Sequence, residues 1–452
     1  MRCIVCAKRR SAATAEASVA VGQQCHPNKK LVNHNNLNLL LVSATWEGIM
    51  SGLRGGAYSP MYFLASLGAG GLAVSFFIYL MFMVDHPDTP MVTFDHLWPL
   101  LADGPLAVRA LVGAAMCAIL VLALVHFRLL LWNLGMHARF RRTEVYRELR
   151  NSNHEVTLMV IPLTLAMSIN LAFVLGAVFV PGLWAVIEYL FPFAILGFLA
   201  VGIYALRVFT DYLTRLFIRG DFDFVDNNNL SQMIAIFAFA MVAVGLAAPG
   251  AMSHHVEINA IAIFLSIFFA SVAVLLGGVK FVLGFKSIIR HGLNESASPS
   301  VWLVIPILTL LGITFVRLSF GLVHGFDGDM SRHHLFVMGS VVVSLEMLFG
   351  LLGMAVMRRM GYFRDYLHGE KRDPGSYSLI CPGVAFFVFG MFFIYYGLGR
   401  LELVERFSPL YFGFLLPLVY VQIKTLFTFL HLNRRFFGGT GLRPGRAAID
   451  AI

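Results

Sequence analysis

The chain has 452 residues, of which 58% are hydrophobic and 13% are charged. A soluble domain carries about 25% charged residues, so this composition excludes an ordinary soluble protein and indicates a membrane protein with several spans. The formal net charge of +9 does not indicate a nucleic-acid partner, because the basic residues fall in alternate loops, as they do in membrane proteins.

Residues 1–57 are polar and irregular. We expect them to form a cytoplasmic tail that is either disordered or a wrongly assigned start, since the segment from Met50 would make a natural beginning. Cys3 and Cys6 form a C-x-x-C pattern, but no second pair follows, so no metal site is predicted. The sequence also lacks nucleotide-binding glycine motifs, and no cofactor is predicted.

A helix needs about 20 apolar residues to cross a hydrocarbon core of about 30 Å. Ten such runs predict an all-α integral membrane domain over residues 58–435, followed by a C-terminal cytoplasmic tail at 436–452. The predicted spans, in chain order, are 60–83, 107–131, 155–179, 183–209, 230–249, 256–283, 299–324, 334–357, 378–398 and 409–432.

The loops between these spans alternate in charge. Loops after the even-numbered spans are basic, as in "HARFRRTEVYRELR" at 137–150, whereas the others are acidic or rich in histidine, as in "GFDGDMSRHH" at 325–334. Because Lys and Arg are retained on the cytoplasmic side, both termini are predicted in the cytoplasm. The expected location is the cell (inner) membrane.

A proline motif recurs in the odd-numbered spans: "VIPLTL" at 160–165, "VIPILTL" at 304–310 and "LICPGV" at 379–384. Proline removes a backbone hydrogen bond and kinks a helix. The first span carries the glycines of "SLGAGGLA" at 66–73 instead. We therefore predict five helical hairpins in a ring, with the kinked odd helices inside around a central pathway and the even helices outside.

Three motifs carry a resemblance to a known family: "SPMYFLASLGAGGLAVSFF" at 59–77, "HEVTLMVIPLT" at 154–164, and a proline early in the ninth span. In this order they make residues 58–435 resemble the tellurite-resistance/dicarboxylate transporter family, which includes TehA-type channels, yeast sulfite exporters and plant slow-type anion channels. The resemblance implies a pseudo-five-fold bundle, often trimeric, whose inner helices enclose a pore for small anions without a cofactor.

One position departs from that pattern. In gated members of the family a phenylalanine directly before the proline of the ninth span blocks the pore, whereas this chain has Cys381 before Pro382. The change resembles the TsoY-like (seleno)protein branch, in which this position can be selenocysteine. Cys381 could then constrict the pore or contact the substrate, act as a redox thiol, or only fill space beside the proline. A redox thiol would need a resolving partner, and Cys117 is the other cysteine in a predicted span.

Three charged residues fall within predicted spans. Glu346 and Lys424 lie at comparable depth, and because charges in lipid are usually paired or functional, we expect them to face one another or the bundle interior. Glu346 would then form a structural salt bridge or act as a coupling proton site. Arg317 could extend to the membrane surface or line the mouth of the pathway.

The remaining candidates for the pore and its gate lie on odd-numbered spans. Thr164 and Thr309 could face the pore or bond back to their own helices, and the phenylalanines after Cys381 could take over the blocking role. The full set is Phe63, Gly68, Pro162, Thr164, Asn170, Pro306, Thr309, Cys381, Pro382, Phe386 and Phe387.

These features predict transmembrane transport of a small anion, such as sulfite or another sulfur oxyanion, a dicarboxylate or a halide. The alternative is a membrane redox protein that uses Cys381, and no other enzymatic activity is expected. The expected partners are the anion, the lipid bilayer and, from the resemblance, two further copies of the chain in a homotrimer.

Overall fold

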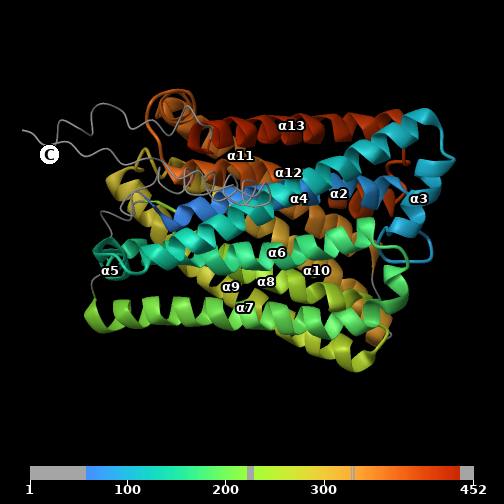
Figure 1. Cartoon of the computed structure of the whole chain (residues 1–452), viewed down its shortest axis with the longest axis horizontal. Coiled ribbons are helices and arrows are strands. Elements are labelled where there is room, and N and C mark those ends of the chain that lie inside the picture. Colours follow the sequence, from blue (N-terminus) through green and yellow to red (C-terminus); the bar gives the residue numbers. More distant parts are fainter. Residues whose placement is uncertain (1–57, 221–228, 327, 329–330, 438–452) are drawn as a thin grey trace, which may run out of the picture. The chain divides into compact units, whose positions relative to one another are not determined.

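The computed structural model describes residues 58–220, 229–326, 328 and 331–437, and every regular element in these ranges is helical (Figure 1). The expected tail at 1–57 and most of that at 436–452 lie outside the described residues. In chain order the elements are η1 (Pro60–Tyr62), α2 (Phe63–Met83), α3 (Phe94–Ala102), α4 (Leu106–Phe140), α5 (Glu144–Arg150), η2 (Asn153–Met159), α6 (Val160–Phe179), α7 (Leu183–Arg219), α8 (Met233–Met252), α9 (Val256–His291), η3 (Ser298–Leu303), α10 (Val304–Phe326), α11 (Arg332–Arg359), η4 (Phe363–His368), η5 (Pro374–Leu379), α12 (Ile380–Phe392), η6 (Phe393–Gly399) and α13 (Pro409–Phe437).

Within these ranges ten helical segments are long and apolar enough to cross a membrane, one for each predicted span. Three of them run at least eight residues past their predicted ends: α4 reaches Phe140, α7 reaches Arg219 and α9 reaches His291. The added residues include Arg and Lys, which a search for apolar runs rejects although both have good helix propensity. At 37 residues α7 is about 55 Å long, which is well beyond a hydrocarbon core of about 30 Å.

Burial separates the ten segments into two groups of five. In the segments that contain α2, α6, α8, α10 and α12, 61 to 94% of the most apolar stretch is buried, compared with 28 to 33% in α4, α7, α9, α11 and α13. We call the first group the core helices and the second the peripheral helices. The alternation follows chain order strictly, so each core helix is followed by a peripheral one.

The contacts between helices place the core helices in a closed circuit. α2 packs against α6, α6 against α8, α8 against α10, α10 against α12, and α12 against α2. Each core helix also packs against the peripheral helix that follows it in sequence. The backbones of α8 and α10 come close together where a Cβ on Gly321 would lie 2.3 Å from the carbonyl oxygen of Gly250. Any residue larger than glycine at Gly321 would therefore push these two core helices apart.

Each peripheral helix carries arginine in its last turn, namely Arg139, Arg219, Arg290, Arg359 and Arg435. We call this side of the bundle the basic end. The core helices begin there, as the contacts of Arg215 with Glu155 and of Arg435 with the Gly369 carbonyl show.

Three core helices begin in the same way. A 3-10 segment precedes α6, α10 and α12, and Pro162, Pro306 and Pro382 each occupy the third position of the α-helix that follows. A proline has no N–H and its ring excludes the carbonyl four residues earlier, so regular α-helix does not continue backward past it. At each of these prolines, where the sequence predicts a kink, the span changes from 3-10 to α-helix.

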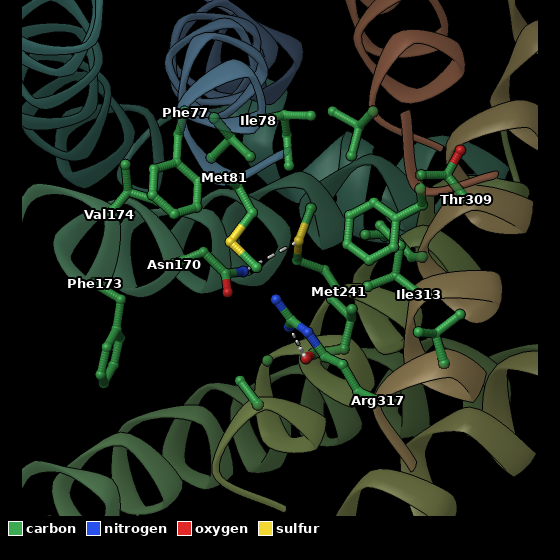
Figure 2. A pocket seen from close by; sticks show the side chains of 18 of the residues that line it. Phe77, Ile78, Met81, Asn170, Phe173, Val174, Met241, Thr309, Ile313 and Arg317 are labelled. Atoms are coloured by element: carbon green, nitrogen blue, oxygen red, sulfur yellow. Dashed lines mark hydrogen bonds between the residues drawn. The ribbon is translucent and has the colours of Figure 1, made fainter. Parts of the chain in front are cut away.

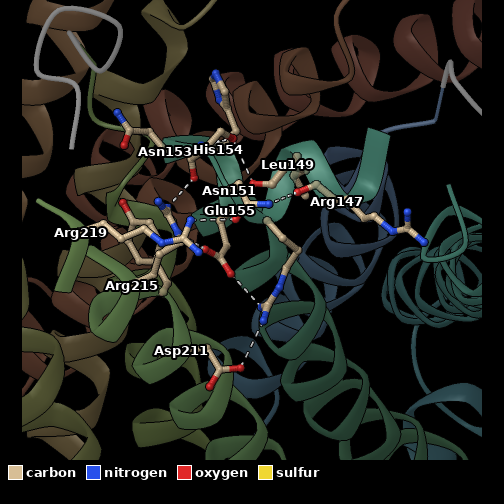
Figure 3. A network of polar contacts seen from close by, with 12 residues as sticks. Arg147, Leu149, Asn151, Asn153, His154, Glu155, Asp211, Arg215 and Arg219 are labelled. Carbon is tan, nitrogen blue, oxygen red and sulfur yellow. Dashed lines mark hydrogen bonds and ion pairs between the residues drawn. The ribbon is translucent and has the colours of Figure 1, made fainter. Parts of the chain in front are cut away.

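A buried ion-pair network fixes the start of α6 at the basic end (Figure 3). The Glu155 side chain is 2% exposed and accepts from Arg150 at 2.8 Å and from Arg215 of α7 at 3.0 Å. Arg150 also approaches Asp211 at 3.4 Å, and Arg219 donates to Asn151 at 3.0 Å. Because both Glu155 oxygens have charged partners, the network ties α5 and η2 to the long helix α7 without leaving a buried charge uncompensated.

Candidate functional site: two hollows between the core helices

A hollow of about 410 Å³ lies among the core helices and is lined by residues from all five. On α10 its lining runs from Pro306 to His324, a distance of about 27 Å at 1.5 Å per residue. Cys381 and Gly68 lie at the deep end, whereas His324 and Arg400 lie at the end away from the basic end. We call this cavity the Arg317 hollow.

Arg317 places a guanidinium group inside this hollow. Figure 2 shows its side chain extending from α10 into the same space that Asn170 and Met241 enter. One guanidinium nitrogen donates to the Val244 carbonyl at 2.7 Å, which uses one of five N–H donors. No Asp or Glu is among the lining residues, and no carboxylate forms an ion pair with Arg317 in the described part of the chain. The positive charge and its remaining donors therefore face the cavity.

Arg400 adds a second cation at the wide end of the Arg317 hollow. Its guanidinium carbon lies 4.7 Å from the centre of the Phe320 ring and 5.3 Å from that of Tyr396. Such stacking orients a guanidinium while leaving its edge free to bind an anion. His324 lines the same region. An anion entering from this side thus meets Arg400 first and Arg317 deeper in.

The rest of the wall is mainly apolar. Besides phenylalanines and branched side chains it includes five methionines, Met81, Met91, Met167, Met241 and Met252. Cys381 is 7% exposed at the deep end, beside the Pro306 and Thr309 level of α10. Cys117 is exposed on the peripheral helix α4. Both thiols are free, and the described residues offer Cys381 no neighbouring cysteine.

A second hollow, of about 540 Å³, opens among the starts of the core helices at the basic end. Its lining is rich in hydroxyl and amide groups, namely Ser59, Asn153, Thr157, Asn229, Ser231, Gln232, Asn294, Ser296, Ser300 and Ser378. Its one carboxylate among the described residues is Asp373, which caps η5 by accepting from the Gly375 N–H at 2.7 Å. Burial raises the pKa of Asp373 above the ordinary aspartate range, while the Gly375 N–H opposes that change. We call this cavity the Asp373 hollow.

The two hollows nearly meet. Ile234, Leu303 and Ser378 line the Asp373 hollow, and the residues three positions further along each helix, Phe237, Pro306 and Cys381, line the Arg317 hollow. The three residues are α-helical on α8, whereas on the other two helices they cross from 3-10 to α-helix, so each gap is about 4.5–6 Å long. On α2 and α6 the gap is longer and is filled by fully buried side chains, which are Phe63, Leu64, Val160, Leu163 and Thr164. A mainly apolar septum about one helical turn thick on three core helices therefore separates two hollows that approach from opposite ends.

The predicted pore and gate residues divide into two sets. Gly68, Asn170, Pro306, Thr309 and Cys381 line the Arg317 hollow. The others line neither hollow; they are Phe63, Pro162, Thr164, Pro382, Phe386 and Phe387.

Local contacts explain why the second set lies elsewhere. Thr164 donates back to the Val160 carbonyl at 2.7 Å, and the Phe387 ring lies 5.0 Å from that of Tyr79. Neither Phe386 nor Phe387 is part of the lining of either hollow. The narrowing is made instead by the septum and the helix starts around it.

The expected meeting of Glu346 with Lys424 is wrong. Glu346 is 1% exposed and faces the bundle, where it contacts Thr309 of α10. Lys424 lies on the exposed face of α13, with its Nζ 5.7 Å from the centre of the Tyr420 ring. Arg317, the third predicted intramembrane charge, lies inside the hollow and not at the surface.

Two further site residues went unnoticed in the sequence. Arg400 falls in a loop of acidic character. Its position directly after a span rich in aromatic residues could have identified it as a site residue. Asp373 lies in a basic loop, and the feature that could have identified it is the Asp-Pro pair, which is typical of a helix start.

Comparisons with protein-family models, curated proteins and solved structures find no match for this chain.

Proposed function

We propose that the protein transports small anions across a membrane through the circuit of core helices. The observation that carries this proposal is the Arg317 hollow, a cavity between membrane-spanning helices that holds Arg317 and Arg400 and has no acidic side chain in its lining. A cation would be repelled at both arginines, whereas an anion gains charge-assisted hydrogen bonds there.

The fold expected from the family resemblance fits this proposal. In that arrangement five hairpins form a pseudo-five-fold bundle, with each core helix paired to the peripheral helix that follows it. The closed circuit of contacts and the strict alternation in burial support it. The two hollows then lie along the axis of the bundle, and the septum between them is the closed gate of the pathway.

The start of the core helices offers a way to open that gate. The septum coincides with the level at which 3-10 segments give way to α-helix near Pro306 and Pro382. Backbone near a proline has fewer fixed hydrogen bonds than a continuous helix, so changes in helix type cost least there. A small rotation at these junctions would join the two hollows.

The orientation follows from the charge of the helix ends. If basic segments stay in the cytoplasm, the basic end and the Asp373 hollow face the cytoplasm, and the Arg317 hollow faces the opposite side. Anions would be collected at Arg400, bound at Arg317 and released through a polar vestibule. The guanidinium fork suits sulfite and carboxylate oxygens, and it also accepts a halide.

Flux from liposomes containing the purified chain tests the proposal. We expect movement of at least one anion from a panel of chloride, nitrate, sulfite and malate, with no movement of potassium. Arg317→Gln should reduce that flux by about 10- to 150-fold, the loss of a charge-assisted hydrogen bond of about 1.5–3 kcal/mol. Arg128→Gln, at an exposed arginine on α4, is the matched control and should change little. Cation flux, or anion flux that Arg317→Gln leaves intact, would refute the proposal.

A further inference from the structure

Glu346 is a carboxyl group buried near the middle of a membrane-spanning helix. It lies 14 residues after the first residue of α11 and 13 before the last, hence about 20 Å from either end. Its side chain belongs to the buried stripe of α11, which also includes Val342 and Phe349, and it is 1% exposed. A buried carboxylate with no cationic partner is costly in a membrane, so the group calls for an explanation.

The single hydrogen bond of Glu346 leads to the Arg317 hollow. Thr309 Oγ1 donates to Glu346 Oε1 at 2.5 Å, and Thr309 itself lines the hollow (Figure 2). The other oxygen, Oε2, is buried and has no hydrogen-bond partner. The carboxyl group is thus connected to the cavity through the Thr309 hydroxyl group.

The titratable side chains on the elements around α11 are engaged elsewhere. Four of them line the hollow, the Tyr395 ring lies 4.9 Å from the Phe82 ring, Lys280 donates to Gln232, and none contacts Glu346 in the described part of the chain. They are Arg317 and His324 on α10, Cys381 on α12, Tyr395 and Tyr396 on η6, and Lys280 on α9, near the contact of Phe281 with Phe349, while η3 carries none. The charges of α11 itself lie at its two ends, at Arg332, His333, His334, Arg358 and Arg359.

We propose that Glu346 is the proton-binding site of a proton-coupled anion cycle and exchanges protons with the Arg317 hollow through Thr309. The inference rests on the proposed anion transport. In the loading step a hydronium ion in the hollow gives a proton to Thr309 Oγ1, and the proton that Thr309 already held passes to Glu346 Oε1. An O–H bond forms on Glu346, Thr309 ends as it began, and water remains. Release reverses the same steps after the septum has opened, and water that enters from the Asp373 hollow accepts the proton and leaves as hydronium on that side.

Coupling arises because a proton on Glu346 and an anion at Arg317 favour one another electrostatically. Binding of the anion adds negative charge to the hollow and strengthens proton binding at Glu346, and by linkage the bound proton strengthens anion binding by the same factor. For a monovalent anion the two charges cancel. The cycle then moves one proton with each anion and needs no resident metal or redox group.

Anion-driven proton movement tests this inference. Liposomes containing the chain and a trapped pH dye are exposed to an inward chloride gradient, since chloride does not itself buffer near neutral pH. Wild-type protein should acidify the lumen in proportion to chloride uptake. Glu346→Gln should abolish the acidification and make chloride uptake independent of pH. Thr309→Val should slow acidification at least tenfold, and Thr309→Ser should restore it. Glu257→Gln, at an exposed glutamate on α9, should behave as wild type.

Infrared spectroscopy of the purified wild-type chain gives a second test that does not depend on flux through a variant. The band of a protonated carboxyl group should disappear as pH rises, and added chloride should shift this titration to higher pH. Such a band would support the site if it is missing from Glu346→Gln. Chloride uptake with no acidification, or acidification that persists in Glu346→Gln, would overturn this inference and leave anion transport standing. The absence of flux for every anion would instead refute the proposed function.

Discussion

The two hollows lie between the same five core helices and differ in almost every chemical respect. The Arg317 hollow has apolar walls of Phe and Met, two guanidinium groups and no acid. The Asp373 hollow has walls of hydroxyl and amide groups and one acid. In the first, an anion would lose much of its water and bind a few fixed cations. In the second it would keep most of its hydration among weak, dispersed donors. Under the proposed anion transport, selection would take place at the Arg317 hollow and release at the Asp373 hollow.

The start of the core helices adds to this difference. Because these helices begin at the basic end, their positive dipole ends surround the Asp373 hollow. Asp373 opposes that potential when it is ionised. An anion that has crossed the septum therefore meets a weakly favourable field that a single carboxyl group can cancel, which suits a release site better than a binding site.

The largest effect is expected from filling the deep end of the Arg317 hollow. Cys381→Phe places a ring where a small side chain now lies next to the septum, and it should lower anion flux at least tenfold by obstruction. Cys381→Ser should retain flux within about threefold, since a hydroxyl differs little from a thiol in volume. Cys381→Phe alone adds an overpacking cost of about 1–3 kcal/mol. Flux through liposomes measures both. Loss of flux in Cys381→Ser together with sensitivity of the wild type to alkylation would assign a chemical role to the thiol instead.

An intermediate effect is expected at the Asp373 hollow. Burial raises the pKa of Asp373, so its carboxyl group becomes charged over a range of pH that lies higher than for an ordinary aspartate. As pH on the basic-end side rises through that raised range, the charge forms and should reduce wild-type anion flux by about two- to fivefold, equivalent to roughly 1 kcal/mol of repulsion. Asp373→Asn keeps the helix cap but carries no charge, so its flux should stay flat and match the wild type only at low pH. Equal flux through the wild type and Asp373→Asn at neutral pH would show that Asp373 does not act on the anion pathway.

The smallest effect is expected from a charge that belongs to neither hollow. Lys424 lies on the exposed face of α13, and Lys424→Met should change both flux and thermal stability little, by no more than about 0.5 kcal/mol in stability, as for most exposed substitutions. Melting temperature and liposome flux test this together. A large loss in either would mean that Lys424 acts from the periphery and that the two hollows do not contain all the functional charges.

The number of spans and their ends away from the basic end were predictable, because long apolar runs have few alternatives in a membrane. Helical periodicity in the sequence could have predicted that Glu346 and Lys424 lie apart. The buried stripe of α13 contains Leu418, Gln422 and Thr425, at spacings of four and three residues, and Lys424 falls outside it. Glu346 lies on the equivalent stripe of α11. Depth alone did not settle which face each side chain occupies, whereas helical periodicity would have.

The cavity lining could be predicted only in part. Asn170, Thr309 and Cys381 were identified as members of proline-bearing spans, but the same reasoning also selected Phe387 and Thr164, which pack away from the hollows. On a core helix almost every face is apolar, and 61 to 94% of the most apolar stretch is buried, so the sequence gives little sign of which face points to the axis. Arg400 and Asp373 lie at helix ends, where the path of the loop decides their position.

The central claim is that the Arg317 hollow selects anions, and the charge preference of a thiol reagent tests it most directly without knowledge of the substrate. In a chain whose native cysteines are replaced by alanine, Ile313→Cys places a thiol on the wall of the hollow, one helical turn from Arg317. The account predicts that an anionic methanethiosulfonate applied from the side of Arg400 reacts at least about tenfold faster than a cationic one of similar size, a difference of about 1.4 kcal/mol, and that Arg317→Gln removes the preference. Equal rates in the presence of Arg317, or a faster cationic reagent, would contradict it.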